Sequence, residues 1–569
     1  MGCFARLRLG VVSSHTIDFI MDALPATALR HSLLLTCVGS VYGQVAQSVL
    51  DPNSPMKGKV DAVLIALDAR MLGLDRAQLC ENRAQAAVDN AIGTLKSLCE
   101  GIRDNLGALC VLTTIPLPTC TLFGEMESRI PGTRRSMVES FNTRILTEVR
   151  SVGDVVVDIA QIANTVGLSN WNEPRAWHAA KLPFALDCTP LYADHVCRVL
   201  AALRGKARKC LVLDLDNTLW GGIIGDDGLE GIKLGQGSAV GEAHVELQSY
   251  AMELRERGVV LAICSKNEET TARAPFKNHP EMILKEDHIA AFIANWKDKA
   301  SNLREIAAML NIGLDALVFL DDNPAEREMI RRELPEVAVP EIGAEPSEYV
   351  AAIARAGWFE GLSFSDEDKR RADYYQANAA RSSAQSSITN MADYLLSLDM
   401  RISILPFDKA GRSRIAQLIN KSNQFNLTTR RYNEAEIAAI ETAPDKFTAQ
   451  VRLVDRFGDN GMISVVIFDK SPKVWFCDTW LMSCRVLGRR VEEALLNRVA
   501  EAAIAEGATK LCGTYLPTKK NGLVERHFAR LGFTQVRSTA DGSTFWELDL
   551  NTHTLADLPI SVCCLAAKD

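Results

Sequence analysis

The segment "KCLVLDLDNTLWGG", which begins at Lys209, joins a buried strand to polar residues that could perform chemistry. Its apolar run at residues 210–213 predicts a core strand, and Asp214, Asp216 and Thr218 follow at alternate positions. A strand interior excludes charges that are neither paired nor bound to a metal ion. The carboxyl end differs, because open α/β sheets form their ligand crevice there. Taken alone, the segment fits either a reactive site or a turn followed by a helix N-cap.

Two later segments repeat this pattern. "VVLAICS" and "ALVFLDD" are also predicted strands with polar ends, and a lysine begins the helix leading into the second of them; the residues concerned are Ser265, Lys266, Asn267, Lys299, Asp321 and Asp322. In a parallel sheet these residues converge on one crevice. Neighbouring carboxylates raise one another's pKa values, and a Mg²⁺ ion bound by oxygen ligands relieves the repulsion. The spacing therefore predicts a Mg²⁺ site formed by four carboxylates, those of Asp214, Asp216, Asp321 and Asp322.

Such a site suits phosphoryl transfer. With a metal ion, a lysine and a hydroxyl group neutralising a phosphate, Asp214 could attack phosphorus to form an aspartyl-phosphate. Asp216 could protonate the leaving group and later deprotonate water. The residues expected to bind the phosphate are Thr218, Ser265, Lys266, Asn267 and Lys299.

The composition limits the classes of function. With 569 residues, the chain is too long for one hydrophobic core and is expected to form three or four domains. Its net charge of −8 argues against non-specific nucleic-acid binding. No apolar run reaches the roughly 20 residues of a membrane span. The 15 cysteines include no CxxC pair and mostly lie in apolar runs, which is typical of reduced thiols in a cytoplasmic protein without structural zinc.

The pattern of elements predicts an α/β multidomain protein. Apolar strands alternate with helical segments over residues 1–205, and a second α/β pattern with a parallel sheet covers residues 206–355. A polar helical connector is expected at residues 356–400. Antiparallel strands followed by helix, strand and helix predict an α+β domain at residues 401–550, and residues 551–569 form a tail without a predicted structure.

The DxDxT motif at residues 214–218, with the later serine, lysine and aspartate pair, resembles the haloacid dehalogenase (HAD) superfamily. This resemblance implies a HAD-like, Rossmannoid parallel-sheet domain. It also implies that Asp214 is the nucleophile and Asp216 the acid and base. The order of elements in the third domain resembles the GNAT fold of N-acetyltransferases.

The first domain resembles SGNH hydrolases, which implies an SGNH/flavodoxin-like α/β domain. Ser14 follows the first predicted strand, and Asp194 and His195 lie near the end of the domain. However, the serine is not part of a GDS motif, and the aspartate directly adjoins the histidine. We therefore expect a scaffold without catalytic activity.

Several longer segments, among them "AICSKNEE", "NQFNLTTRRY" and "SCRVLGRRVEEALL", resemble the FkbH-like family. The resemblance spans most of the chain. It implies a Mg²⁺-dependent phosphatase and glyceryltransferase that uses D-1,3-bisphosphoglycerate, a small phosphorylated three-carbon substrate. The glyceryl group would pass to the phosphopantetheine thiol of an acyl carrier protein, for polyketide extender units of the methoxymalonyl type. Two alternatives are a HAD phosphatase acting on another phosphorylated metabolite and a carrier-protein docking scaffold without turnover.

An acyl phosphate such as the C1 group of that substrate is open to direct attack by a thiolate. Cys484 lies where a predicted strand passes into a helix, next to several arginines, and both features lower the pKa of a thiol. Cys264, which precedes Ser265, is the rival candidate. Direct transfer to the carrier thiol, without an enzyme thioester, is the third possibility.

Residues of the third domain are candidates for binding the carrier's phosphopantetheine arm. "RVLGRR" partly matches the pyrophosphate loop of acetyltransferases, although Arg490 stands where that loop needs a small residue. "QFNLTTRRY" offers further cations, or is simply an exposed basic loop. The residues expected to contact the arm are Asn423, Arg430, Arg431, Arg485, Gly488 and Arg489.

Overall fold

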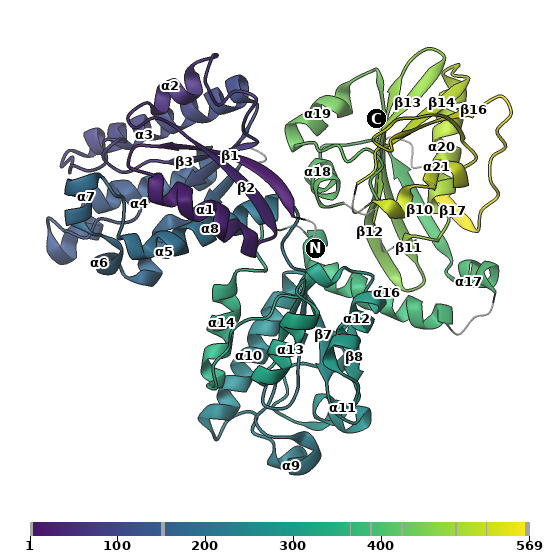
Figure 1. Cartoon of the computed structure of the whole chain (residues 1–569), viewed down its shortest axis with the longest axis horizontal. Helices are drawn as coiled ribbons and strands as arrows, with labels where there is room; N and C mark the ends of the chain where they lie inside the picture. Colours follow the sequence, from purple (N-terminus) through teal and green to yellow (C-terminus); the bar gives the residue numbers. More distant parts are fainter. Residues whose placement is uncertain are drawn as a thin grey trace. The chain divides into compact units, whose positions relative to one another are not determined.

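The computed structural model describes residues 4–149, 154–362, 364, 366–386, 390–422, 425–483, 486–518 and 521–563. The chain divides into two compact units, Met1–Lys206 with Glu360–Leu362 and Ala207–Phe359 with Ser363–Asp569. Figure 1 shows the elements along the chain. Among the described residues, no helix has the length and apolar character needed to cross a membrane.

The first unit contains a five-stranded parallel sheet in the order β2-β1-β3-β4-β5. Its strands are β1 (Ala5–Ser13), β2 (Leu33–Gly39), β3 (Ala62–Ala66), β4 (Leu109–Thr113) and β5 (Val155–Val157). The main helices are α1 (Asp18–Arg30), α3 (Glu81–Gly101), α4 (Arg134–Arg144) and α8 (Thr189–Leu203), with the shorter α2 (Val45–Leu50), α5 (Ile159–Val166), α6 (Leu168–Trp171) and α7 (Pro174–Ala180). Separate apolar cores, one including α1 and α8 and the other α3 and α4, cover the sheet. This strand order is flavodoxin-like, which agrees with the SGNH/flavodoxin-like α/β domain that the resemblance implies.

The second unit begins with a four-stranded parallel sheet in the order β8-β7-β6-β9. Its strands are β6 (Cys210–Leu213), β7 (Val260–Ser265), β8 (Ala291–Ala294) and β9 (Leu317–Leu320). The accompanying helices are α9 (Ile224–Gly231), α10 (Ala239–Glu256), α11 (Glu269–Asn278), α12 (Lys299–Met309), α13 (Pro324–Glu333) and α14 (Tyr349–Ala356). Strand β6 is central, so its carboxyl end lies between those of β7 and β9.

Three helices follow, namely α15 (Asp366–Lys369), α16 (Arg371–Ser386) and α17 (Met391–Ser397). They lead into an eight-stranded mixed sheet in the order β15-β16-β14-β13-β12-β11-β10-β17. The strands are β10 (Met400–Leu405), β11 (Lys446–Asp455), β12 (Gly458–Lys470), β13 (Val474–Met482), β14 (Lys510–Tyr515), β15 (Thr534–Ser538), β16 (Thr544–Asp549) and β17 (Ile560–Cys563). The helices are α18 (Arg412–Lys421), α19 (Glu434–Thr442), α20 (Val491–Ala505) and α21 (His527–Arg530). The α+β order agrees with the sequence analysis, but the expected tail contributes β17, which pairs in parallel with β10.

Candidate active site

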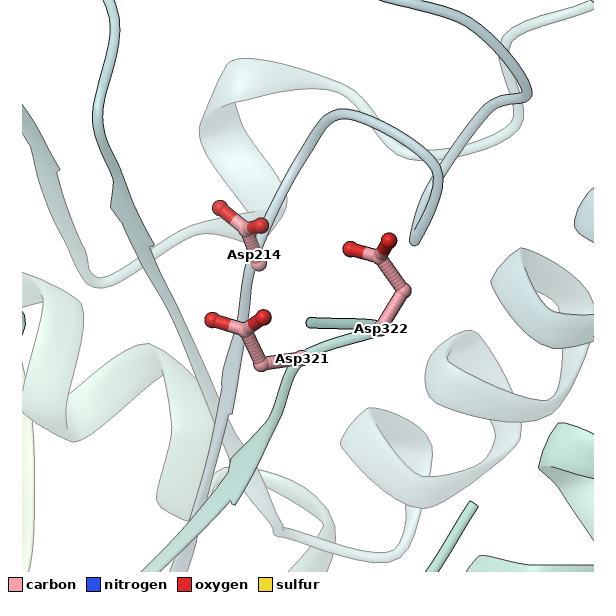
Figure 2. A group of neighbouring side chains, drawn as sticks. All are labelled: Asp214, Asp321 and Asp322. Carbon is pink, nitrogen blue, oxygen red and sulfur yellow. The ribbon is translucent and has the colours of Figure 1, made fainter. Parts of the chain in front are cut away.

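Three carboxylates meet at the carboxyl edge of the β8-β7-β6-β9 sheet. Asp214 directly follows the central strand β6, and Asp321 and Asp322 directly follow β9. One oxygen atom from each of the three side chains lies within 4.8 Å of the other two. Figure 2 shows the three side chains together at the ends of these neighbouring strands. The convergence that the sequence predicts for these three residues is therefore present in the fold.

Lys299 is the cation nearest to this cluster. Its side chain is 4% exposed, and its Nζ lies 3.0 Å from Asp214 Oδ2 and 2.5 Å from Asp321 Oδ2. Burial alone would lower the pKa of Lys299, but the two carboxylates raise it above its ordinary value. Lys299 is thus a permanent positive charge that opens helix α12 and points back into the site.

One lysine does not neutralise three carboxylates. Burial raises the pKa of Asp214 to about 6, with Lys299 acting in the opposite direction and Asp321 adding to the rise. Burial also raises the pKa values of Asp321 and Asp322. In addition, Asp214 Oδ1 is buried without a hydrogen-bond partner in the part of the chain that the structure describes. The site therefore has a deficit of positive charge and an unsatisfied oxygen ligand, and both features fit a Mg²⁺ ion.

This charge deficit has a measurable consequence. Because the folded-state pKa of Asp214 is raised, its contribution to stability is present in acid and is lost as the pH rises through about 6. A bound divalent cation replaces the missing protons. Mg²⁺ is therefore expected to raise the Tm more at pH 8 than at pH 5, measured by differential scanning calorimetry against EDTA. An equal shift at both pH values would show that these carboxylates are not the ligands.

Thr218, one of the expected phosphate-binding residues, contacts the cluster directly. The Thr218 hydroxyl donates to Asp322 Oδ1 at 3.3 Å and accepts the Asp322 amide at 3.1 Å. It thus orients one of the three carboxylates. Ser265 ends β7 next to β6 and is buried.

The Asp216 carboxylate does not belong to the cluster, in contrast to the expectation of a fourth metal ligand. Among the described residues, the group that could hold an ion consists of Asp214, Asp321 and Asp322. The strand ends at Leu213, and Asn217 turns the chain with a φ of 54°, so strand alternation no longer directs the side chain of Asp216. Asp216 instead accepts hydrogen bonds from surrounding residues of the chain.

Lys266 and Asn267, the two other expected phosphate ligands, also have partners within the protein. Lys266 Nζ pairs with Glu326 Oε1 at 2.6 Å, and Asn267 Nδ2 donates to Asp216 Oδ2 at 2.7 Å. The sequence showed that these polar residues follow β7. It did not show that Lys266 would form an ion pair with Glu326 or that Asn267 would donate a hydrogen bond to Asp216.

Cys264 is poorly placed to act as a nucleophile. It is fully buried on β7 within an apolar cluster, and its Sγ faces the carbonyl oxygen of Lys299 at 3.9 Å. Burial raises the pKa of its thiol well above the ordinary value. Cys484, Arg485 and Asn423 lie outside the described residues.

The remaining candidates for carrier binding are engaged by the protein itself. Arg430 forms an ion pair with Asp478 of β13, and Arg431 donates to the carbonyl oxygens of Ile419 and Ser422. These contacts tie the loop before α19 to its surroundings.

The loop before α20 is held in a similar way. Arg489 is buried, and its Nη1 lies 3.1 Å from Asp455 Oδ2. Gly488 has a φ of 75°, a left-handed conformation that favours glycine. A role of these residues in carrier binding therefore stays a prediction.

In the first unit, Asp194 of α8 accepts hydrogen bonds from His31 Nε2 at 2.8 Å and from Arg30 at 2.7 Å, and it pairs with Arg198 at 2.6 Å. Burial would raise the pKa of Asp194, but these partners lower it below its usual range. The aspartate thus joins α1 and α8. Ser14 Oγ accepts the backbone amide of Asp68 at 2.9 Å.

The parallel sheet, the aspartate cluster at its edge and the buried lysine define a HAD-like phosphoryl-transfer domain. Comparison with known proteins agrees with this class. The chain matches the N-terminal part of a protein from Bacteroides fragilis, described as containing a phosphatase domain complexed with Mg, with 30% identity over 63% of this chain and 96% of that chain and a TM-score of 0.59. Residues 8–201 match the model of the FkbH N-terminal domain. The chain therefore belongs to the FkbH-like family.

Two acetyltransferase structures match a smaller part of the chain. One is the ribosomal-protein-S18-alanine N-acetyltransferase of Escherichia coli, with 12% identity over 26% of this chain and 94% of that chain and a TM-score of 0.21. The other is the GNAT domain of S. lividans PAT, with 18% identity over 26% and 89% and a TM-score of 0.22. No curated protein matches the sequence.

Proposed function

We propose that this protein is a Mg²⁺-dependent phosphatase and glyceryltransferase, which dephosphorylates D-1,3-bisphosphoglycerate and transfers the glyceryl group to an acyl carrier protein. The observation that carries the proposal is the cluster of Asp214, Asp321 and Asp322 around Lys299. Membership of the FkbH-like family supports the substrate. The Mg complex of the similar Bacteroides fragilis phosphatase domain supports the cofactor.

The phosphatase half of the reaction uses the first aspartate as nucleophile. An oxygen of Asp214 attacks the C3 phosphate, the bond between phosphorus and the C3 oxygen breaks, and an aspartyl-phosphate forms. When bound, Mg²⁺ offsets the negative charge of the phosphoryl oxygens. Lys299 adds a second positive charge next to Asp214. Asp216 gives its proton to the leaving oxygen and then takes one from the water that hydrolyses the intermediate.

The acyl half requires a thiolate that attacks the C1 carbonyl and expels phosphate. Cys484 is our preferred acyl carrier because of its arginine-rich sequence context. The burial and raised pKa of Cys264 argue against that rival. Transfer of the glyceryl group from one thiol to another conserves the thioester, so passage from an enzyme cysteine to the carrier needs no further energy source.

The surroundings of the phosphatase site suit a large partner. Within the described residues, the segment between β6 and β7 contains the two helices α9 and α10, so this insert forms no separate cap domain. Trp296, on the loop between β8 and Lys299, is 76% exposed. An exposed tryptophan side chain close to a reactive site is typical of a surface that a partner covers on binding.

Intact-mass spectrometry tests the proposal. Incubation with 1,3-bisphosphoglycerate and Mg²⁺ is expected to release phosphate and to add one glyceryl group to the protein, which then moves to an added phosphopantetheinylated carrier. Phosphate release without an adduct on either protein would favour a phosphatase for another metabolite. If no phosphate were released and no adduct formed, the remaining hypothesis would be a docking scaffold without turnover.

Cys484→Ala is expected to prevent the glyceryl adduct while phosphate release from C3 continues, because the thiol takes no part in attack on phosphorus. The matched control is Cys264→Ala, which removes a buried thiol of raised pKa and should still form the adduct. If Cys484→Ala still formed the adduct and Cys264→Ala did not, Cys264 would be the acyl carrier instead of Cys484. Both variants are compared by the same mass measurement and by phosphate assay.

A further inference from the structure

The carboxylate of Asp216 is held by three hydrogen-bond donors. Oδ1 accepts from Trp220 Nε1 and from the backbone amide of Ile224, both at 3.0 Å, and Oδ2 accepts from Asn267 Nδ2 at 2.7 Å. Both oxygen atoms are therefore held, and Oδ2, which accepts a single hydrogen bond, keeps a lone pair that can carry the transferred proton. Asp214, two residues earlier, instead has one buried oxygen without a hydrogen-bond partner in the described part of the chain.

The donors come from well-fixed parts of the fold. Trp220 is fully buried, and its ring packs edge-on against Phe276 with 6.2 Å between the ring centroids. Ile224 is the first residue of helix α9, and Asn267 is buried in the turn after β7. Two of these donors lie four and eight residues after Asp216, and the third lies 51 residues away on the neighbouring strand's turn, so the carboxylate is fixed from two sides.

This orientation separates two aspartates that would otherwise compete for the same cation. A carboxylate bound to a divalent metal ion is a poor proton donor and acceptor, since the metal stabilises its charged form. Asp216 lies close in sequence to a cluster that lacks positive charge, so a free side chain would be drawn towards a bound ion. The three donors keep its carboxylate out of that cluster.

We propose that Trp220 and Asn267 are positioning residues that keep the carboxylate of Asp216 off the metal ion and oriented for proton transfer. This inference rests on the proposed phosphatase function and assigns Asn267 to Asp216 instead of to the phosphate. It also gives Trp220, which the sequence analysis did not single out, a role in the reaction through its indole N–H. Loss of either donor then impairs proton transfer more than substrate binding or attack on phosphorus.

The leaving group of the substrate distinguishes these effects. An alkyl phosphate such as glycerol 3-phosphate needs a proton on its leaving oxygen, whereas p-nitrophenyl phosphate releases a stable anion. For Trp220→Phe and Asn267→Ala, kcat for the alkyl phosphate is expected to fall about a hundredfold, within the contribution typical of a general acid, with little change in KM. The first burst of p-nitrophenol is expected to persist, followed by slow turnover, because the aspartyl-phosphate still needs a base for hydrolysis.

Trp475→Phe serves as the matched control, since it makes the same truncation at a buried tryptophan of β13 and should leave both activities unchanged. Circular dichroism confirms that each variant is folded, and differential scanning calorimetry should show a larger stabilisation by Mg²⁺ in Trp220→Phe and Asn267→Ala than in the wild type, because the Asp216 carboxylate is then free to join the cluster. Equal loss of the burst and of alkyl turnover would overturn the inference, as would a raised KM with unchanged kcat in Asn267→Ala, which would indicate a phosphate ligand. Wild-type protein that releases no phosphate from 1,3-bisphosphoglycerate would instead overturn the proposed function.

Discussion

Replacing Asp214 with asparagine is expected to abolish phosphate release without destabilising the metal-free protein. The amide is no nucleophile towards phosphorus, so turnover should fall by at least about a thousandfold. The substitution also removes one of three crowded negative charges, and Lys299 keeps its contact with Asp321 at 2.5 Å. The Tm in EDTA should therefore equal or exceed that of the wild type, while the stabilisation by Mg²⁺ becomes smaller.

Asp216→Asn provides the comparison for this experiment, because it changes the same functional group two residues away, outside the cluster. That variant should retain the stabilisation by Mg²⁺ although its steady-state turnover falls. If Asp214→Asn instead unfolded in EDTA while its residual activity stayed high, the residue would be structural and the assignment of the nucleophile would be wrong.

Lys299→Met is expected to have the largest effect on stability. The change leaves Asp214 and Asp321 buried without their cation, and breaking a buried ion pair in this way costs about 3–5 kcal/mol. Phosphate release should also fall strongly, because a positive charge next to the reacting phosphate is lost. Urea denaturation in EDTA and in Mg²⁺ measures the effect, and Mg²⁺ should restore part of the lost stability.

Lys297→Met is the matched control, since Lys297 is exposed on the loop that precedes α12, two residues before Lys299. It should change the free energy of unfolding little, as is usual for a surface substitution. Similar effects of the two substitutions would show that the charge balance of the cluster does not determine stability.

Much of the fold could be predicted from apolar runs. Strands β3 to β7 and β9 are predominantly apolar segments, because helices cover both faces of a parallel sheet, whereas β1 also contains Arg6 and Arg8 in its first half. Strand β8 has only the four residues Ala291–Ala294, which is too short for a periodic signal. Strand β17 depends on pairing with β10, about 160 residues earlier in the chain, and local sequence contains no information about such a partner.

The site could be predicted where strand ends decide the position of a side chain. Asp214, Asp321 and Asp322 directly follow neighbouring strands, so the topology alone brings them together. Asp216 could not be placed, because beyond Leu213 its direction depends on a turn at Asn217 and on a hydrogen bond from Asn267, 51 residues away in the sequence. The partners of Lys266 and Arg430 likewise lie 60 and 48 residues away in the sequence.

A crystal structure with Mg²⁺ and beryllium fluoride, an analogue of the aspartyl-phosphate, would test the central assignment most directly. We expect one Mg²⁺ ion bound by the carboxylate cluster, beryllium fluoride attached to an oxygen of Asp214, and Asp216 still hydrogen-bonded to Trp220. Beryllium fluoride on another residue, or a metal ion bound away from Asp214, Asp321 and Asp322, would contradict the account.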